Sequence, residues 1–248
     1  MFMTQRCWDG WVAYFENRGY TCSALPWPGR DLPLETLREQ HPDPQLGKLT
    51  LDEVVDAFDR AIRAMPQAPV IIGHSMGGLV TQILINRGLG AAGVAVDPAP
   101  PLGVFPTQWS FLRANWAVLN PLIASSIPHD MSFQQFQYAF VNGMPLEEQR
   151  RAYDEQVVPE SRRVGRGALS KVAKLDFTRP HAPLLLLAGS IDHIIPAGLN
   201  RANYERYKAS PSLTDFHEFP GRNHYGIGQS GWEEMARWVM DWLEKKAG

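Results

Sequence analysis

A serine lies between glycines in the segment Gly73-His74-Ser75-Met76-Gly77. The apolar run 70–72 precedes it, and a helical pattern follows it. A serine on a sharp strand-to-helix turn has strained backbone, so the residues two positions away on each side must be small. Gly73 and Gly77 meet that requirement, and the start of the helix would favour a developing negative charge beside Ser75. The pattern therefore predicts a nucleophilic serine.

A serine hydroxyl needs a base, and seven histidines compete for that role. His74 lies inside the turn and is predicted to be structural, and His217 falls within a predicted strand. His224 follows the last predicted strand, and in open α/β sheets the active crevice lies at the carboxyl ends of the strands. The predicted base is therefore His224.

The base in turn needs a carboxylate to orient it, and two aspartates follow predicted strands. Asp192 lies in Gly189-Ser190-Ile191-Asp192, after the apolar run 184–188. Asp97 lies after the run 94–96, but its Asp-Pro sequence is also explained as a turn that ends the strand. We favour Asp192, with Asp97 as the alternative.

Predicted strands alternate with predicted helices along most of the chain. The strands are 20–25, 70–72, 94–96, 184–188 and 214–219, and helical patterns occupy about 8–18, 51–65, 77–87 and 231–243. Thr50 and Glu53 form a capping box for the second helix, and we assign the same role to Ser230 and Glu233 in the last one. This order predicts a mostly parallel α/β sheet flanked by helices.

The segment 101–180 interrupts that alternation, because it carries helical patterns and no convincing strand. Eight aromatic residues lie between positions 101 and 140. One interpretation is a helical insertion with its own small core, and the other is a cap whose inner face forms an apolar substrate pocket. On the second interpretation, Trp109, Phe136 and Phe140 are candidate substrate-binding residues.

Composition excludes several classes of protein. The formal net charge is −2, so there is no electrostatic indication of binding to nucleic acid or to an anionic membrane. The apolar share of 44% and the charged share of 20% are typical of a globular protein, and no apolar run approaches a membrane span. The two cysteines, Cys7 and Cys22, do not resemble a disulfide framework or a metal site, and no cofactor or metal is predicted. No signal-peptide pattern is recognised, so we expect a cytoplasmic protein.

Taken together, these motifs make the chain resemble an α/β-hydrolase-fold serine hydrolase with a helical cap. The segment 73–78 resembles the family's nucleophile elbow, 189–196 its acid turn, and the order Ser75, Asp192, His224 is the family's order. The resemblance implies a core of residues 1–100 and 181–248, with 101–180 as the cap. It also implies a two-step acyl transfer, with the N–H of Met76 as one oxyanion donor.

One part of the family pattern is missing at the start of the chain. The resemblance implies a strand ending in His-Gly before the first helix, and the residue after it supplies the second oxyanion N–H. Here Met1-Phe2-Met3-Thr4 resembles the loop after that motif. Phe2, with Met1 as the alternative, is therefore the candidate second donor, and we expect about 20–30 upstream residues to carry the missing strand in the physiological protein.

The expected function is hydrolysis of small to medium, apolar carboxylic esters or lactones. Thioesterase, amidase and perhydrolase chemistry on the same residues remain alternatives, because a fold alone does not determine its chemistry. Dehalogenase and epoxide hydrolase chemistry is disfavoured, since the resemblance implies a carboxylate nucleophile for those enzymes. A binding protein without turnover is the alternative from a different class, favoured by the missing oxyanion strand. The expected partner is a small-molecule substrate, with no nucleic acid and no membrane.

Overall fold

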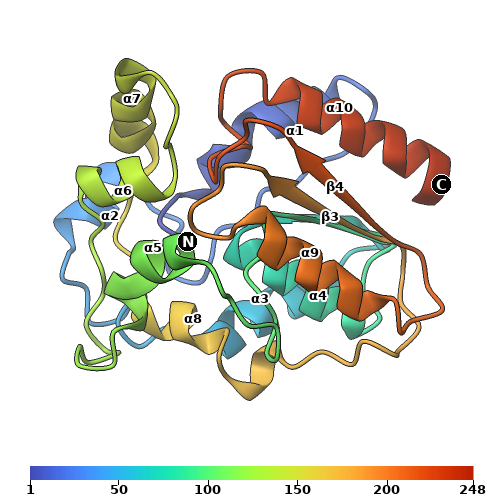
Figure 1. Cartoon of the computed structure of the whole chain (residues 1–248), viewed down its shortest axis with the longest axis horizontal. Coiled ribbons are helices and arrows are strands. Elements are labelled where there is room, and N and C mark those ends of the chain that lie inside the picture. Colours follow the sequence, from blue (N-terminus) through green and yellow to red (C-terminus); the bar gives the residue numbers. More distant parts are fainter. Residues whose placement is uncertain (248) are drawn as a thin grey trace.

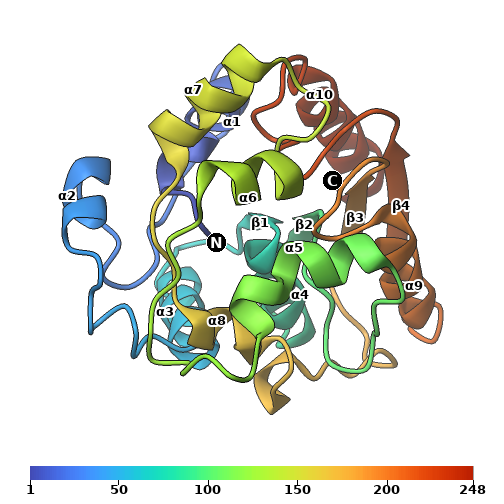
Figure 2. The same ribbon diagram turned by 60° about the vertical axis from the view of Figure 1, so that its left-hand side comes forward.

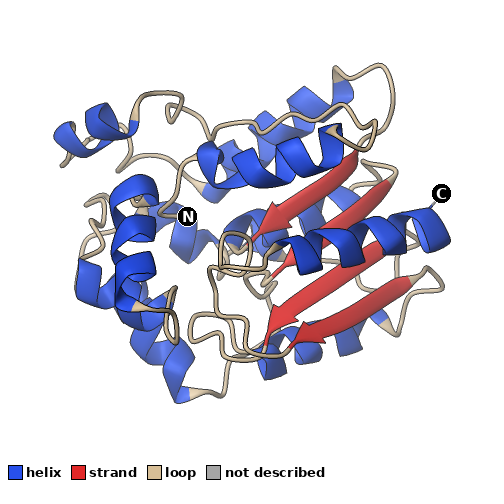
Figure 3. Ribbon diagram, turned by 90° about the horizontal axis from the view of Figure 1, so that it is seen from above, coloured by secondary structure: helices blue, strands red, loops and turns tan. Residues whose placement is uncertain are grey.

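A sheet of four parallel strands forms the centre of the molecule. The computed structural model describes residues 1–247. The strands are β1 (Val70–His74), β2 (Ala92–Val96), β3 (Leu184–Gly189) and β4 (Thr214–Phe219), and they lie in the order β1-β2-β3-β4. All three pairings are parallel, so every carboxyl end lies at the same edge (Figures 1 and 3). The predicted parallel α/β sheet is confirmed.

The predicted strand at residues 20–25 is wrong. That segment is an irregular, partly exposed loop and pairs with no strand of the described chain. Its sequence is Tyr-Thr-Cys-Ser-Ala-Leu, which offers few large apolar side chains for a sheet face. Pro26 and Pro28 follow, and neither can donate a backbone hydrogen bond to a ladder.

Helices cover both faces of the sheet (Figure 1). The first half of the chain contains α1 (Asp9–Glu16), α2 (Leu34–Glu39), α3 (Leu51–Arg63) and α4 (Met76–Asn86), and the last third contains α9 (Ala197–Tyr207) and α10 (Glu233–Trp242). On one face α1 and α10 pack against Val94, Val96, Leu185 and Leu187. On the other face α3, α4 and α9 enclose Ala95, Leu184 and Leu186. Because both faces are buried, β2 and β3 are apolar throughout.

The two predicted capping boxes have different outcomes. Thr50 accepts from the N–H of Glu53, whose carboxylate accepts from the N–H of Thr50, so the first box is confirmed. The second is wrong, because α10 begins at Glu233 and its N-cap residue is Trp232, which makes no side-chain cap. Gly231 has a φ of 77° and separates Ser230 from the helix, so the serine lies outside capping range.

The segment 101–180 contributes α5 (Trp109–Leu119), α6 (Phe133–Ala139), α7 (Leu146–Gln156) and α8 (Arg162–Gly167), and no strand. These helices lie beyond the carboxyl edge of the sheet (Figures 2 and 3). Two short antiparallel bridges, Met3 with Val157 and His129 with Glu160, hold the segment to the start of the chain and to itself. That the segment 101–180 forms a separate cap domain stays a prediction. None of the described helices has the length and apolarity needed to cross a membrane.

Candidate active site

Ser75 lies on a tight turn between β1 and α4. Its φ of 57° and ψ of −121° are a conformation that a residue with a side chain rarely adopts. A Cβ atom on Gly73 would lie 2.2 Å from the carbonyl oxygen of Gly77, so only glycine fits at position 73. A Cβ on Gly77 would meet nothing within 4 Å. The expected need for a small residue therefore holds at position 73 and not at position 77. A Cβ on Gly78 would lie 2.9 Å from Pro98, and this glycine therefore lets α4 approach the turn after β2.

The loops after β1, β3 and β4 bring Ser75, Asp192 and His224 into one hydrogen-bonded chain. The Oγ atom of Ser75 lies 2.9 Å from Nε2 of His224, and Nδ1 of His224 lies 2.6 Å from Oδ2 of Asp192. A carboxylate only accepts hydrogen bonds, so Nδ1 carries the proton and donates it to Asp192. Nε2 is then the acceptor for the Ser75 hydroxyl. This arrangement can remove the proton from a serine oxygen as it attacks a carbonyl carbon.

Asp192 is held by backbone groups as well as by the imidazole. Its Oδ1 atom accepts from the N–H of Ile194 at 2.7 Å and from the N–H of Ile195 at 2.9 Å. The side chains of Asp192 and His224 are both fully buried. Burial raises the pKa of Asp192, while these two N–H groups favour its ionised form. Three donors on one buried carboxylate satisfy most of its acceptor capacity.

Asp97, the alternative acid, lies beside the same group without a hydrogen bond to His224. Its Oδ1 atom accepts from the N–H of Gly189 at 2.7 Å, and its Oδ2 atom is buried with no partner. Its side chain is completely buried. Burial and the neighbouring Asp192 raise the pKa of Asp97 well above its usual range. The structure thus brings both candidate acids together, and only Asp192 contacts the imidazole.

His74 has a role that its sequence position did not reveal. It is buried, as predicted, and its Nε2 atom lies 2.7 Å from the carbonyl oxygen of His224. Because a carbonyl only accepts, Nε2 of His74 is the donor. Burial lowers the pKa of both histidines below the ordinary value, so both are neutral at neutral pH. His74 therefore ties the loop that carries His224 to the end of β1.

His74, Asp97 and His224 also present ligand atoms within 4.8 Å of one another. Both ring nitrogens of His224 already bond to Ser75 and Asp192, and Nε2 of His74 bonds to a carbonyl group. A metal ion at this point would have to break those hydrogen bonds. The donor set therefore fits a hydrogen-bond network better than a metal site.

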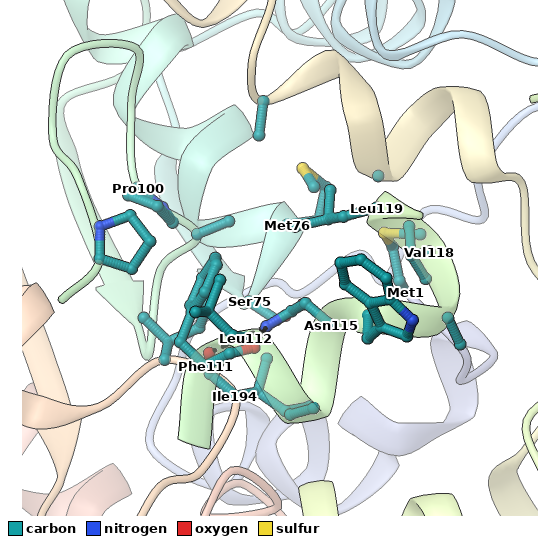
Figure 4. A pocket seen from close by; sticks show the side chains of 18 of the residues that line it. Met1, Ser75, Met76, Pro100, Phe111, Leu112, Asn115, Val118, Leu119 and Ile194 are labelled. Atoms are coloured by element: carbon teal, nitrogen blue, oxygen red, sulfur yellow. Dashed lines mark hydrogen bonds between the residues drawn. The ribbon is translucent and has the colours of Figure 1, made fainter. Parts of the chain in front are cut away.

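A cavity of about 540 Å³ opens directly over Ser75. Its volume lies within the range of about 300–1,000 Å³ that is typical of small-molecule sites. Figure 4 shows Phe111, Leu112 and Asn115 of α5 around the serine, with Pro100 from the loop after β2 and Ile194 from the loop after β3. Most of its lining side chains are apolar. The cavity thus suits a largely hydrophobic ligand.

The three aromatic residues predicted to bind substrate occupy different places. Phe140 lines the cavity and stands edge-on to His224, with the ring centroids 4.9 Å apart. Trp109 is 74% exposed and lies outside the lining, so its prediction is corrected. Phe136 is also outside the lining, because it is fully buried against Phe140, Tyr153 and Tyr225. The sequence revealed that aromatic residues are concentrated in this segment, but not which of them face the cavity.

Other residues of the same segment line the cavity and were not predicted. Phe105, Leu112, Trp116 and Leu169 line it and are also largely exposed, so they form its mouth. The available signal was in α5, whose apolar residues occur on all sides of the helix. A helix without a polar face presents apolar side chains beyond the surface that packs on the core, and in α5 Leu112 and Trp116 do so at the cavity.

The two predicted oxyanion donors differ in whether their N–H group is free to donate. Met76 is the first residue of α4, so its N–H has no acceptor within the helix and remains available beside Ser75. The N–H of Phe2 is directed at Oε2 of Glu160, at 3.4 Å. In this arrangement Phe2 is not a free donor, although its side chain lines the cavity.

The sequence of the chain matches a known protein family. The model of the family described as "Alpha/beta hydrolase family" matches residues 1–239. A search of curated protein sequences found no match.

Solved structures with a similar fold cover nearly the whole chain. A monoacylglycerol lipase of Paleococcus ferrophilus has a TM-score of 0.70 at 20% identity, covering 98% of this chain and 90% of its own. A pyrethroid hydrolase from Sphingobium faniae JZ-2 has a TM-score of 0.65 at 15% identity, with 99% and 95% covered. Tomato methylketone synthase I, as a variant complexed with β-ketoheptanoate, has a TM-score of 0.69 at 14% identity, with 100% and 95% covered. Identities this low indicate a shared fold.

Proposed function

Because this chain belongs to the alpha/beta hydrolase family, we propose that it hydrolyses carboxylic esters or lactones of small to medium apolar compounds. The observation that carries the proposal is the hydrogen-bonded chain from Ser75 through His224 to Asp192, with distances of 2.9 and 2.6 Å, beneath an apolar cavity. Similar structures include a lipase and a pyrethroid hydrolase, which is consistent with ester chemistry.

The proposed reaction has two steps. The Oγ atom of Ser75 attacks the substrate carbonyl while Nε2 of His224 takes the hydroxyl proton, and Asp192 stabilises the imidazolium that forms. The N–H of Met76 stabilises the negative oxygen of the tetrahedral intermediate. His224 then gives its proton to the leaving alcohol. Water repeats the sequence on the acyl-enzyme, releases the acid and restores the serine.

The cavity supports an apolar substrate rather than a charged one. Its mouth is formed by Phe105, Leu112, Trp116 and Leu169, and its interior by further apolar side chains. Arg113 also lines the cavity, but it is exposed and its guanidinium lies over the Tyr138 ring. Burying a charged group among the apolar side chains would cost several kcal/mol, so we expect neutral esters to be preferred. A lactone fits the same description, because ring opening needs only the same attack on a carbonyl carbon.

A panel of p-nitrophenyl esters of increasing acyl length, together with lactones and thioesters, tests the proposal. Ser75→Ala should remove nearly all ester turnover, since no other group can form the acyl-enzyme. Ser110→Ala is a matched control, because Ser110 lies on α5 outside the cavity lining. Turnover of Ser75→Ala within tenfold of the parent protein would contradict the assignment.

Binding without turnover is the second candidate, favoured by the engagement of the Phe2 N–H with Glu160. A site with a single oxyanion donor stabilises the tetrahedral intermediate less, and losing one donor costs about 10²–10³ in rate. A fluorophosphonate probe that labels Ser75, in a protein with no measurable ester turnover, would favour this candidate.

A further inference from the structure

Asp97 is a buried carboxyl group that the proposed reaction does not use. It follows β2 directly, with a φ of 43°, and its N–H donates to the carbonyl oxygen of Leu187 at 2.9 Å. Left-handed backbone is uncommon for a residue with a side chain, although aspartate tolerates it better than most. The surrounding structure thus holds Asp97 in a costly conformation, directed at the loop after β3.

The titratable groups around Asp97 and its neighbour Asp192 come from three other loops and strands. They are His74 at the end of β1, Asp192 and His193 in the loop after β3, and His224 in the loop after β4. Both imidazoles nearest to Asp97, on His74 and His224, are buried and neutral, so no cation there offsets a second negative charge. Two carboxylates in such surroundings cannot both ionise at neutral pH.

The hydrogen bonds indicate which carboxyl group keeps the proton. Asp192 accepts from two backbone N–H groups and from the imidazole of His224, while Asp97 accepts from the single N–H of Gly189. More donors stabilise the ionised form, so Asp192 is the carboxylate. On Asp97, Oδ1 takes the Gly189 N–H and Oδ2 has no partner as an acceptor. A proton on Oδ2 would make it a donor, and Asp192 offers the nearby carboxylate: both carboxyl groups approach His224, Asp192 at 2.6 Å and Asp97 within 4.8 Å, and both residues hydrogen-bond to the backbone of Gly189.

We propose that Asp97 is a positioning residue, a carboxylic acid whose Oδ2–H donates a hydrogen bond to the Asp192 carboxylate and fixes it against His224. This inference rests on the proposed function. The bond explains the unpartnered Oδ2 atom, because as a hydroxyl it is satisfied. It also explains why two acids converge on one imidazole while only Asp192 contacts it. The hydrogen bond from Asp97 also delocalises the negative charge of Asp192. That charge therefore stabilises the imidazolium of His224 less, and His224 is a weaker base than it would be beside Asp192 alone.

Two substitutions distinguish this role from that of an ionised second acid. Asp97→Asn keeps an acceptor for Gly189 and replaces the hydroxyl donor with an amide N–H donor, so kcat and the acid limb of kcat/KM should stay close to those of the parent. Asp97→Ala removes the donor, and kcat should fall about 10–100-fold, as for other supporting residues around an active site, with KM little changed. Its acid limb should move to higher pH, because an unshared Asp192 charge stabilises the imidazolium and raises the pKa of His224.

An ionised Asp97 predicts the opposite response. Asp97→Asn would then remove a negative charge near His224, lower the pKa of the imidazole and move the acid limb to lower pH. That result, or an Asp97→Ala variant indistinguishable from the parent, would overturn the proposal. If Asp97→Ala fails to fold, the pH of the acid limb of kcat/KM in Asp97→Asn alone distinguishes a protonated Asp97 from an ionised one.

The low-field proton resonance of the His224 Nδ1–H provides a readout that needs no substrate. It should be unchanged in Asp97→Asn, shifted in Asp97→Ala and lost in Asp192→Asn. A parent protein that hydrolyses none of the esters tested would contradict the proposed function while leaving this measurement intact. An Asp97→Asn resonance that shifts as far as that of Asp97→Ala would contradict the hydrogen bond itself.

Discussion

The two glycines that flank Ser75 should respond in opposite ways to the same added methyl group. In Gly73→Ala the new Cβ would lie 2.2 Å from the carbonyl oxygen of Gly77 and 2.4 Å from Oγ1 of Thr81, against ordinary contacts of 3.4–4 Å. The first neighbour is backbone at the start of α4 and cannot rotate away, so strand or helix must move. Overpacking of this kind costs about 1–3 kcal/mol. Gly77→Ala places its Cβ in open space within a helix and should stabilise the fold by up to about 1 kcal/mol.

The difference between the two variants is therefore about 1–4 kcal/mol, which corresponds to about 2–16 °C in Tm for a chain of this size. Turnover should follow the same ranking, since a displaced α4 moves Ser75 away from His224 and a misplacement near 1 Å can cost about 10²-fold. Calorimetry and initial rates on one ester measure both effects. Equal Tm values for the two variants, or a Gly73→Ala protein as active as the parent, would refute the reasoning.

Three further predictions concern the segment 101–180 and the histidines. In denaturant titrations, Phe136→Ala should lower the free energy of unfolding by about 3–5 kcal/mol, because its side chain is fully buried, and it should leave the acyl-length preference unchanged. Trp109 is 74% exposed, so Trp109→Ala should change that free energy by no more than about 0.5 kcal/mol. The kcat/KM of the parent should fall on the acid side with an apparent pKa below the ordinary histidine value of about 6.5, because burial lowers the pKa of His224 and only the neutral ring accepts a proton. The unfolded state then binds more protons than the folded state, so stability should also decrease as pH falls below about 6.5. An apparent pKa at or above about 6.5 would contradict the first statement, and a stability that does not decrease below that pH would contradict the second. His74→Ala should lower kcat by about 3–10-fold with KM retained, as expected for losing one hydrogen bond to the loop of His224, and an unchanged kcat would show that the bond does not position the base.

The sequence predicted those parts of the molecule that local chemistry determines. Continuous apolar runs marked β1, β2 and β3, since a strand covered on both faces needs no polar alternation. The motif around Ser75 marked the turn between β1 and α4, and His224, selected because it follows a predicted strand, does lie within hydrogen-bonding distance of Ser75. The segment 20–25 was misread because its short mixed pattern resembles a strand, while pairing depends on a neighbour that sequence alone does not reveal.

Properties that depend on tertiary contacts were not predictable from the sequence. Asp97 and Asp192 are more than ninety positions apart in the sequence, and their proximity arises from the adjacency of β2 and β3 in the sheet. The lining of the cavity depends on how α5 is rotated about its axis, which placed Leu112 on the cavity and left Trp109 in solvent. The engagement of the Phe2 N–H with Glu160 likewise joins residues 158 positions apart.

The proposed nucleophile and the proposed base follow the two outer strands of the described sheet. Ser75 follows β1 and His224 follows β4, and within the described chain each of these strands has a ladder on one side only. Outer strands open more readily than inner ones, at a free energy below that of global unfolding. Fraying of either strand would separate Oγ of Ser75 from Nε2 of His224 while β2, β3 and their helices stay folded. On heating, the proposed ester turnover would then be lost before the rest of the described sheet melts.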